Sequence, residues 1–357
     1  MRCFNNDIKN RKKKMFIVFL LLITIFPQSC NKVSHAPAPA EFGVKDNIYD
    51  SEFPAKPVSR YLEKMVGTVK LLSTFSVYNV YSYDEGTPSV LIKKDPEKYA
   101  YQTYVEEKPA NGTATIIYNR NGLVALLTCA HIIDTPDTLI KYFDEDGQSI
   151  KSIHILERQN RLIVGMDEFQ SFKIFIMDTK KDIALIGNKI PLKKSVKIPV
   201  FPFKQGNADD LSWGTFTYLF GYPKGKQMLS RAIVSNPHRN NGASFVIDAS
   251  LPRGISGGVV LALRDGPPNF ELVGMVNAVS ADMAKILVPD RRMNSKNYRP
   301  GRPYTGKIYA KSVPRISYGI EYAITINAIT KFIEDNKEKL ESFGFDMNGF
   351  FKTNSPK

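Results

Sequence analysis

Three short segments of the 357-residue chain contain residue types that together could carry out acyl transfer. His131 follows an apolar stretch, Asp182 precedes one, and Ser256 lies between glycines in Gly254-Ile255-Ser256-Gly257-Gly258. A serine hydroxyl becomes an effective nucleophile when an imidazole accepts its proton, and a carboxylate orients that imidazole. The segments therefore predict Ser256 as a nucleophile, His131 as its base and Asp182 as the orienting group.

The glycines around Ser256 predict how the site would stabilise negative charge. Gly254 and Gly257 allow a tight backbone turn with little side-chain obstruction. In such a turn the backbone amides of Gly254 and Ser256 can point at the oxygen that becomes negative during attack. Loss of one such donor typically lowers turnover by about 100- to 1000-fold. We therefore expect these two amides to form an oxyanion hole.

The order of the three residues along the chain separates three kinds of serine hydrolase. The segment around Ser256 also fits the G-x-S-x-G nucleophile elbow of α/β-hydrolases, in which the histidine follows the serine. The four histidines, His35, His131, His154 and His238, all precede Ser256, which excludes that fold. A subtilisin-like order needs an aspartate before the histidine and an α/β fold, and a strand-dense sequence gives that alternative no support.

Many short strands are expected to position these residues. From about Met65, apolar or alternating runs are separated by Gly, Asn, Asp and Pro, which is typical of an all-β barrel or sandwich. One helix is expected near the C-terminus, because Asn327 can cap it and Ile329 and Ile333 share one face. The predicted strands are 66–72, 76–83, 113–118, 123–128, 172–177, 183–186, 215–220, 245–247, 259–263 and 272–276.

The three segments resemble the chymotrypsin-like serine proteases, whose catalytic positions lie in T-x-A-H, D-I-A-L and G-x-S-G-G. The disulfide-free bacterial branch, which includes the HtrA-type periplasmic proteases, is the most similar. Further similarities are a G-x-P-x-G turn at 221–225, strands at 246–251 and 273–276, and a last strand and helix at 316–333. The resemblance spans the greater part of the chain.

The resemblance implies an all-β fold of two antiparallel six-stranded β-barrels followed by a C-terminal helix. His131 and Asp182 would come from the first barrel, and Ser256 with the oxyanion amides from the second. It implies a serine endopeptidase that acts through an acyl-enzyme intermediate, without a cofactor or metal. A polypeptide substrate would lie extended and pair with the strand edge at 273–278.

The resemblance also places the substrate pocket, with its floor near Ser250 and its walls at Asn277 and Ala278. Because position 250 is not acidic, we expect small or medium apolar side chains to be preferred to Lys or Arg before the cleaved bond. Animal members carry an aspartate directly before the nucleophile, and it receives a new N-terminal amine on activation. Ile255 occupies that position here, so we expect no such zymogen switch, and we expect no PDZ domain after the helix.

The first 29 residues predict export. Six Lys and Arg residues precede the apolar run Met15–Phe26, which is typical of a secretory signal and short for a membrane span. The following Ser29-Cys30 resembles the cleavage site of bacterial lipoproteins, with Cys30 as the lipidated first residue. An ordinary cleaved signal or an uncleaved anchor is the alternative. We therefore expect a membrane-anchored lipoprotein in the periplasm or on the surface of a bacterium.

The same pattern divides the chain into segments. We predict a lipoprotein-type signal peptide at 1–29, an Ala- and Pro-rich tether at 30–60, a trypsin-like protease domain at 61–345 and a tail at 346–357. Within the protease domain, the first barrel would span 61–200, the second 201–325 and the terminal helix 326–345.

Composition and charge limit the possible partners. The chain is 43% hydrophobic and 24% charged, which is ordinary for a globular protein. The full chain has a net charge of +14, and loss of residues 1–29, with six basic residues and one acidic residue, would leave +9. That charge is compatible with contact with anionic lipid or another polyanion, but no nucleic-acid-binding motif accompanies it, so we expect no specific nucleic-acid partner. Cys129 would be the one spare thiol of the mature chain, so no internal disulfide is expected. The basic segment 281–315 is either a solvated loop or a binding surface.

Two other functions are compatible with the sequence. A pseudoprotease that serves as a surface or periplasmic binding module is one, since Ile255 and the Tyr-rich and basic inserts at 78–108 and 281–315 depart from the family pattern. An enzyme that processes only its own tether is the other. Reactivity of Ser256 would separate the pseudoprotease from the peptidase, and a size change that depends on Ser256 would reveal self-processing.

Overall fold

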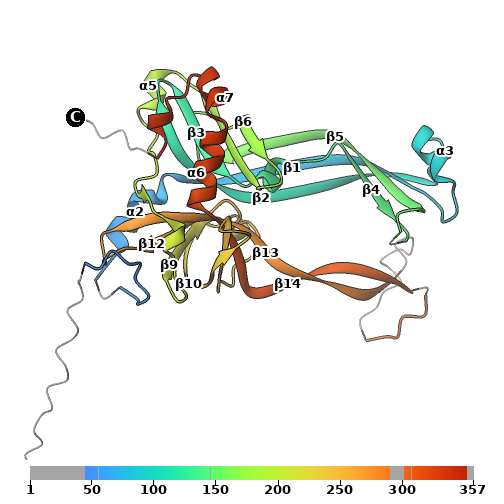
Figure 1. The fold of residues 1–357 in the computed structure, drawn as a ribbon. Coiled ribbons are helices and arrows are strands. Elements are labelled where there is room, and N and C mark those ends of the chain that lie inside the picture. The colour runs from blue at the N-terminus through green and yellow to red at the C-terminus, as the bar shows by residue number, and fades with distance from the viewer. Residues whose placement is uncertain (1–44, 55, 145, 290–300, 307, 352–357) are drawn as a thin grey trace, which may run out of the picture. The chain divides into compact units, whose positions relative to one another are not determined.

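The computed structural model describes residues 45–54, 56–144, 146–289, 301–306 and 308–351. The expected signal peptide and lipidated Cys30 lie outside these residues, as does most of the tether. Two seven-stranded, mainly antiparallel sheets account for the strands of the described chain (Figure 1). The prediction of an all-β, chymotrypsin-like fold is confirmed.

The first sheet contains the strands that carry His131 and Asp182. Its strand order is β4-β5-β1-β2-β3-β7-β6, and the edge strands β4 and β6 do not pair. The sheet is therefore a curled half-barrel, whereas the sequence predicted a closed barrel of six strands. Its strands are β1 (Val69–Ser82), β2 (Gln102–Arg120), β3 (Leu123–Thr128), β4 (Thr138–Tyr142), β5 (Ile150–Val164), β6 (Lys173–Asp178) and β7 (Ile183–Lys189).

Three long strands extend the first sheet beyond its curled part. The strands β1, β2 and β5 run past its curled part as an extended arm (Figure 1). The Tyr-rich segment 78–108 forms the end of β1, the helix α3 (Ser89–Lys94) and the start of β2. The arm has a small apolar core of its own, which includes Tyr83 and Ile92.

The second sheet carries Ser256 and closes into a barrel. The strands β12, β9, β10, β11, β14 and β13 follow one another, and an additional β12–β13 pairing joins the two ends. The short strand β8 adds to β13 by a parallel pairing. The strands are β8 (Lys204–Gln205), β9 (Phe216–Gly221), β10 (Met228–Arg239), β11 (Ser244–Ile247), β12 (Val259–Leu263), β13 (Phe270–Pro289) and β14 (Ile308–Thr325). Beyond the barrel, β13 and β14 continue as a two-stranded ribbon (Figure 1).

The predicted C-terminal helix is present as two helices, α6 (Ile326–Asp335) and α7 (Lys337–Ser342). The Thr325 hydroxyl caps α6 by accepting a hydrogen bond from the Ala328 amide at 3.2 Å. The prediction of Asn327 as the cap is therefore wrong. The helix begins before it, and its side chain accepts a hydrogen bond from the Ala208 amide at 2.9 Å.

The other helices are short, and they are α2 (Ser59–Val66), α4 (Ala130–Ile133) and α5 (Leu192–Ser195). Within the described part of the chain, no helix is long and apolar enough to cross a membrane. The segment before α2 packs on the second barrel, where Tyr49 is buried and its hydroxyl donates to Glu271 at 2.7 Å.

Candidate active site

The pairing of β3 with β7 places His131 beside Asp182. Thr128, the last residue of β3, pairs with Ala184 in β7. The chain beyond Thr128 and the chain before Ala184 therefore leave the sheet at the same end. There α4 carries His131, and Asp182 adopts a left-handed backbone with φ of 57°. Aspartate adopts this conformation more readily than most other non-glycine residues.

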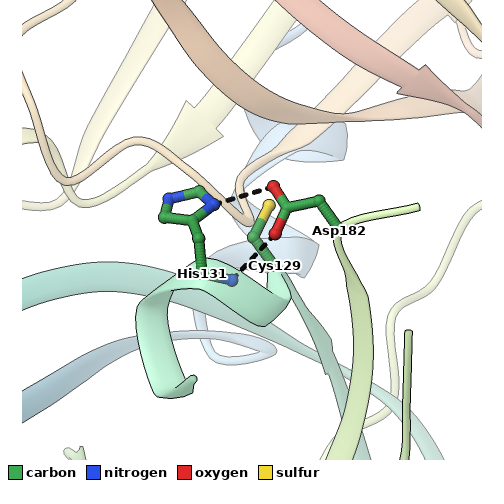
Figure 2. Close-up of side chains that lie close together, drawn as sticks. All are labelled: Cys129, His131 and Asp182. Atoms are coloured by element: carbon green, nitrogen blue, oxygen red, sulfur yellow. Dashed lines mark hydrogen bonds and ion pairs between the residues drawn. The ribbon is translucent and has the colours of Figure 1, made fainter. Parts of the chain in front are cut away.

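One carboxylate holds both the ring and the backbone of His131 (Figure 2). The Nδ1 atom of His131 lies 2.7 Å from Oδ2 of Asp182, and the His131 amide donates to Oδ1 at 2.8 Å. Because an ionised carboxylate can only accept, this contact assigns the proton to Nδ1 and leaves Nε2 as the basic nitrogen. The His131 side chain is 49% exposed and that of Asp182 is 16% exposed. The imidazole of His131 is thus accessible to solvent, while the Asp182 carboxylate that holds it is mostly buried.

A residue of the second barrel completes the surroundings of Asp182. The Asn277 side-chain amide donates to Oδ2 of Asp182 at 3.1 Å. Asn277 was predicted as a pocket wall, and here its amide contacts the carboxylate that holds His131. This hydrogen bond joins the two sheets at the candidate site.

Cys129 lies beneath this pair and is fully buried. Its thiol donates to the Val276 carbonyl oxygen at 3.3 Å. Burial, followed by the nearby Asp182 carboxylate, raises the pKa of the Cys129 thiol well above its ordinary value. Donor atoms of Cys129, His131 and Asp182 lie within 4.8 Å of one another, so the three residue types could also hold a metal ion. The Cys129 thiol and both oxygens of Asp182 already have hydrogen-bond partners in the protein, which accounts for the cluster without a metal.

The loop that carries Ser256 is fixed to the same framework. The Gly257 amide donates to the Val276 carbonyl oxygen at 2.7 Å, the acceptor that Cys129 also uses. Ser256 itself is half-buried. No hydrogen bond joins its hydroxyl to His131 in the described structure. The fold thus brings the two segments together without closing the serine–histidine contact, which in unliganded enzymes is often long.

Hydrogen bonds set the orientation of both candidate oxyanion amides. The Arg253 carbonyl accepts from the Lys224 amide at 2.8 Å, and the Ile255 carbonyl accepts from the Gly258 amide at 2.7 Å. In a trans peptide the N–H points opposite to the C=O, so the Gly254 and Ser256 amides point away from these contacts. Neither amide has an acceptor within the described residues. The assignment of these two amides to an oxyanion hole stays a prediction.

Thr113 in β2 connects this loop to the first sheet. Its amide donates to the Ser256 carbonyl oxygen at 2.8 Å, and its hydroxyl donates to the Gly254 carbonyl oxygen at 3.0 Å. The same hydroxyl accepts from the Tyr222 amide at 2.9 Å. Its carbonyl accepts from the Thr128 hydroxyl at 2.7 Å, three residues before His131. Sequence reasoning missed Thr113, because nothing in the local pattern distinguishes it from other strand threonines.

The predicted pocket residues have different surroundings. Ser250 is exposed. Ala278 lies in β13, and its side chain is outside the described part of the structure. Asn277 contacts Asp182, as described above. The assignment of a pocket floor to Ser250 and walls to Asn277 and Ala278 stays a prediction.

Comparison with known proteins shows what part of the chain is similar to. Residues 112–275 match the trypsin-like peptidase domain family. This segment contains all three candidate catalytic residues, and the predicted resemblance to the chymotrypsin-like serine proteases is confirmed. No curated protein matches the chain. Among solved structures it is similar to a variant of the HtrA-type protease AlgW with a decapeptide. The identity is 16%, 81% of this chain and 68% of that chain are covered, and the TM-score is 0.40.

Proposed function

We propose that this protein is an exported serine endopeptidase in which Ser256, His131 and Asp182 form the catalytic triad. The observation that carries the proposal is the shared framework of the site. The Asp182 carboxylate lies 2.7 Å from Nδ1 of His131. Thr113 donates hydrogen bonds to the carbonyl oxygens of Gly254 and Ser256 in the nucleophile loop. Fixed groups of this kind lower the barrier because they need no reorganisation during the reaction.

The chemistry follows from the positions of the groups. Oγ of Ser256 attacks the substrate carbonyl carbon while Nε2 of His131 takes the hydroxyl proton. The carbonyl oxygen becomes an oxyanion and accepts hydrogen bonds from the Gly254 and Ser256 amides. The C–N bond then breaks, and His131 gives its proton to the departing amine. Water, deprotonated by His131, hydrolyses the acyl-enzyme ester, which releases the carboxylic acid product and restores Ser256. Asp182 stays ionised and stabilises the imidazolium.

A polypeptide is the proposed substrate because its backbone can pair with β13 from Asn277 onward, where β12 no longer pairs with that strand. The part of the predicted edge before Asn277 is not available, because β13 is paired with β12 and β14 up to Met275 and Val276 exchanges hydrogen bonds with the Gly257–Gly258 segment. The reaction needs no cofactor, since the protein groups supply the nucleophile, the base and the oxyanion donors. Anchoring through a lipid on Cys30 rests on the N-terminal sequence. Incorporation of an alkyne-tagged fatty acid by cells tests it, and Cys30→Ser should abolish the incorporation.

Labelling of the full chain with a fluorophosphonate tests the nucleophile. We expect labelling that disappears in Ser256→Ala. Ser152 offers a matched control, because its hydroxyl lies 3.0 Å from Nε2 of His154 and His154 lies 2.8 Å from Glu106. Ser152 is buried, so Ser152→Ala should leave labelling unchanged. Folded protein that resists labelling would contradict the peptidase and favour the pseudoprotease, whose binding partners would then be sought.

A further inference from the structure

The ribbon that β13 and β14 form beyond the second barrel exposes apolar side chains on one face (Figure 1). Side chains alternate between the two faces of a strand, so the odd-numbered residues of 283–289 share a face with their partners in β14. On this face Met283 is 66% exposed, Leu287 is 72% exposed and Ile308 is 56% exposed. Val288, on the opposite face, is partly covered. The ribbon thus has one face whose large apolar side chains lie mostly in solvent.

Cationic side chains accompany these apolar ones. Lys285 is exposed on the same face, and Lys311 is exposed on the other strand of the ribbon. From Met283 to Ile320 the sequence contains nine Lys or Arg residues and a single acidic residue, Asp290. The next acidic residue along β14, Glu321, is 1% exposed and lies between β11 and β13 in the barrel. The segment that contains the ribbon is therefore strongly cationic.

A solvated loop does not account for this combination. Large exposed apolar side chains on a strand with a free edge promote association unless a partner covers them. At the surface of an anionic bilayer, cations bind the headgroups and apolar side chains enter the boundary with the acyl chains. An acidic polypeptide matches the cations but leaves the apolar side chains in water. The composition of the ribbon therefore fits an anionic lipid surface best.

We propose that the ribbon binds the surface of an anionic lipid membrane, with Met283, Leu287 and Ile308 inserted at the level of the headgroups. Lys285 and Lys311 bind lipid phosphates on either side of them. The two strands of a ribbon lie about 5 Å apart, so long cationic side chains from both faces can reach the headgroups. This inference goes beyond the proposed peptidase function and does not depend on it.

The proposed lipid on Cys30 would make even a weak contact of this kind effective. The 14 residues from Asn31 to Val44 separate Cys30 from the described chain and span about 50 Å at most when extended. An anchored protein therefore keeps its ribbon at a high effective concentration of membrane. The ribbon is thus a second membrane contact, formed by the folded domain itself.

Vesicle sedimentation tests the cationic part of the contact. The chain from residue 31 onward lacks both the apolar run Met15–Phe26 and Cys30, and it retains the fold because the residues from Lys45 onward form a compact unit. We expect it to bind phosphatidylcholine vesicles that contain about one-third phosphatidylglycerol at least about tenfold more tightly than pure phosphatidylcholine.

Paired charge-removing variants attribute this binding to the ribbon. Lys311→Gln combined with Arg315→Gln removes two exposed cations of β14 and should weaken binding to the anionic vesicles about tenfold or more. Lys193→Gln combined with Lys194→Gln is the matched control, because these two exposed lysines lie on α5 and the change in net charge is the same. Equal losses in the two double variants would overturn the proposal.

A fluorescent label tests the insertion of the apolar face. In the chain from residue 31, Cys129 is the one cysteine and is fully buried, so Leu287→Cys provides the reactive thiol for an environment-sensitive nitrobenzoxadiazole label. We expect its emission to shift to the blue and to increase with anionic vesicles. Val90→Cys is the control, because Val90 is 78% exposed on α3, outside the ribbon, and its label should not respond.

The remaining outcomes identify other occupants or separate the two proposals. Binding that is absent, or equal for both kinds of vesicle, overturns the proposal, as does a label at position 287 that stays in water. Self-association without vesicles that Leu287→Ser abolishes would assign the face to a second copy of the chain and overturn it. Binding of polyglutamate as tight as that of anionic vesicles would assign it to an acidic polypeptide, with the same consequence. Labelling of Ser256 by a fluorophosphonate is a separate measurement, so either proposal can fail without the other.

Discussion

The Thr113 hydroxyl donates a hydrogen bond to the Gly254 carbonyl oxygen at 3.0 Å, so a residue of the first sheet holds a peptide of the nucleophile loop in the second barrel. The Thr113 amide holds the Ser256 carbonyl oxygen as well. Because Thr113 is fully buried, water does not compete for these hydrogen bonds. The conformation of the loop between the two oxyanion amides thus depends on the packing of the two sheets against each other.

Replacement of Thr113 tests this coupling. Thr113→Val keeps the shape of the side chain but removes the hydroxyl that joins Tyr222 to Gly254. We expect turnover to fall by about 10- to 100-fold, because the Gly254–Ile255 peptide, which lies between the two oxyanion amides, loses its anchor. The free energy of unfolding should fall by about 1–3 kcal/mol, because a buried donor and a buried acceptor lose their partner. Thr113→Ser retains the hydroxyl and should recover most of the turnover. Equal turnover in wild type and Thr113→Val would contradict the coupling.

Gly257 provides a prediction about the fit between loop and sheet. Its φ is 84°, and a Cβ added there would lie 1.9 Å from the Thr113 carbonyl oxygen. Gly257→Ala should therefore displace the Ser256 loop, abolish phosphonate labelling and destabilise the fold by more than about 3 kcal/mol. Gly86→Ala is the matched control, because Gly86 has φ of 93° with open space around it. It should cost about 1 kcal/mol and leave labelling intact. Similar losses of stability and labelling in Gly257→Ala and Gly86→Ala would mean that the positive φ causes them and not the contact with Thr113.

The sequence predicted the fold class and the pairing of His131 with Asp182, because short local motifs and strand periodicity are properties of contiguous residues. It could not predict that the first sheet stays open, since closure depends on which distant strands meet. The contacts of Thr113 join residues more than 100 positions apart, and no local pattern records them. Glu321 was overlooked for the same reason, because its burial arises only when three strands assemble around it.

The Asp182–His131 contact predicts a large effect of an isosteric substitution. Asp182→Asn would place an amide opposite Nδ1, which favours the tautomer whose Nε2 carries a proton and cannot act as a base. We expect turnover to fall by about four orders of magnitude with little change in KM, as for such a substitution in other triads. Measurement of kcat and KM with a peptide ester or amide decides this. Loss of only a few-fold would contradict the role of Asp182.

Asn277 is either a positioning residue or a pocket wall, and kinetics separate the two. Its amide donates to Asp182 at 3.1 Å, so Asn277→Ala should lower kcat about tenfold while KM stays close to wild type. Asn277→Ser can keep a donor and should restore part of kcat. A pocket wall would behave differently, because its loss changes KM and the preference among substrates. A rise in KM at constant kcat would therefore support the pocket assignment.

The buried Glu321 predicts how stability depends on pH. Burial raises the pKa of its carboxyl group from 4.5 to about 7 in the folded protein. Between these values the folded state binds more protons at this position than the unfolded state, so stability falls as the pH rises. A rise of this size corresponds to roughly 3 kcal/mol, complete once the pH exceeds the folded pKa.

Glu321→Gln removes the titration and keeps the side-chain shape. We expect the variant and the wild type to be similarly stable near pH 4.5. The variant should become the more stable of the two as the pH rises to about 7, with a constant difference above that value. Urea unfolding of both proteins at half-unit pH intervals measures this difference directly. Glu271→Gln is the comparison, because contacts with Lys204, Tyr49 and Arg264 lower the pKa of Glu271 and its removal should destabilise the fold. A pH-independent difference between Glu321→Gln and wild type would show that Glu321 stays ionised in the folded protein.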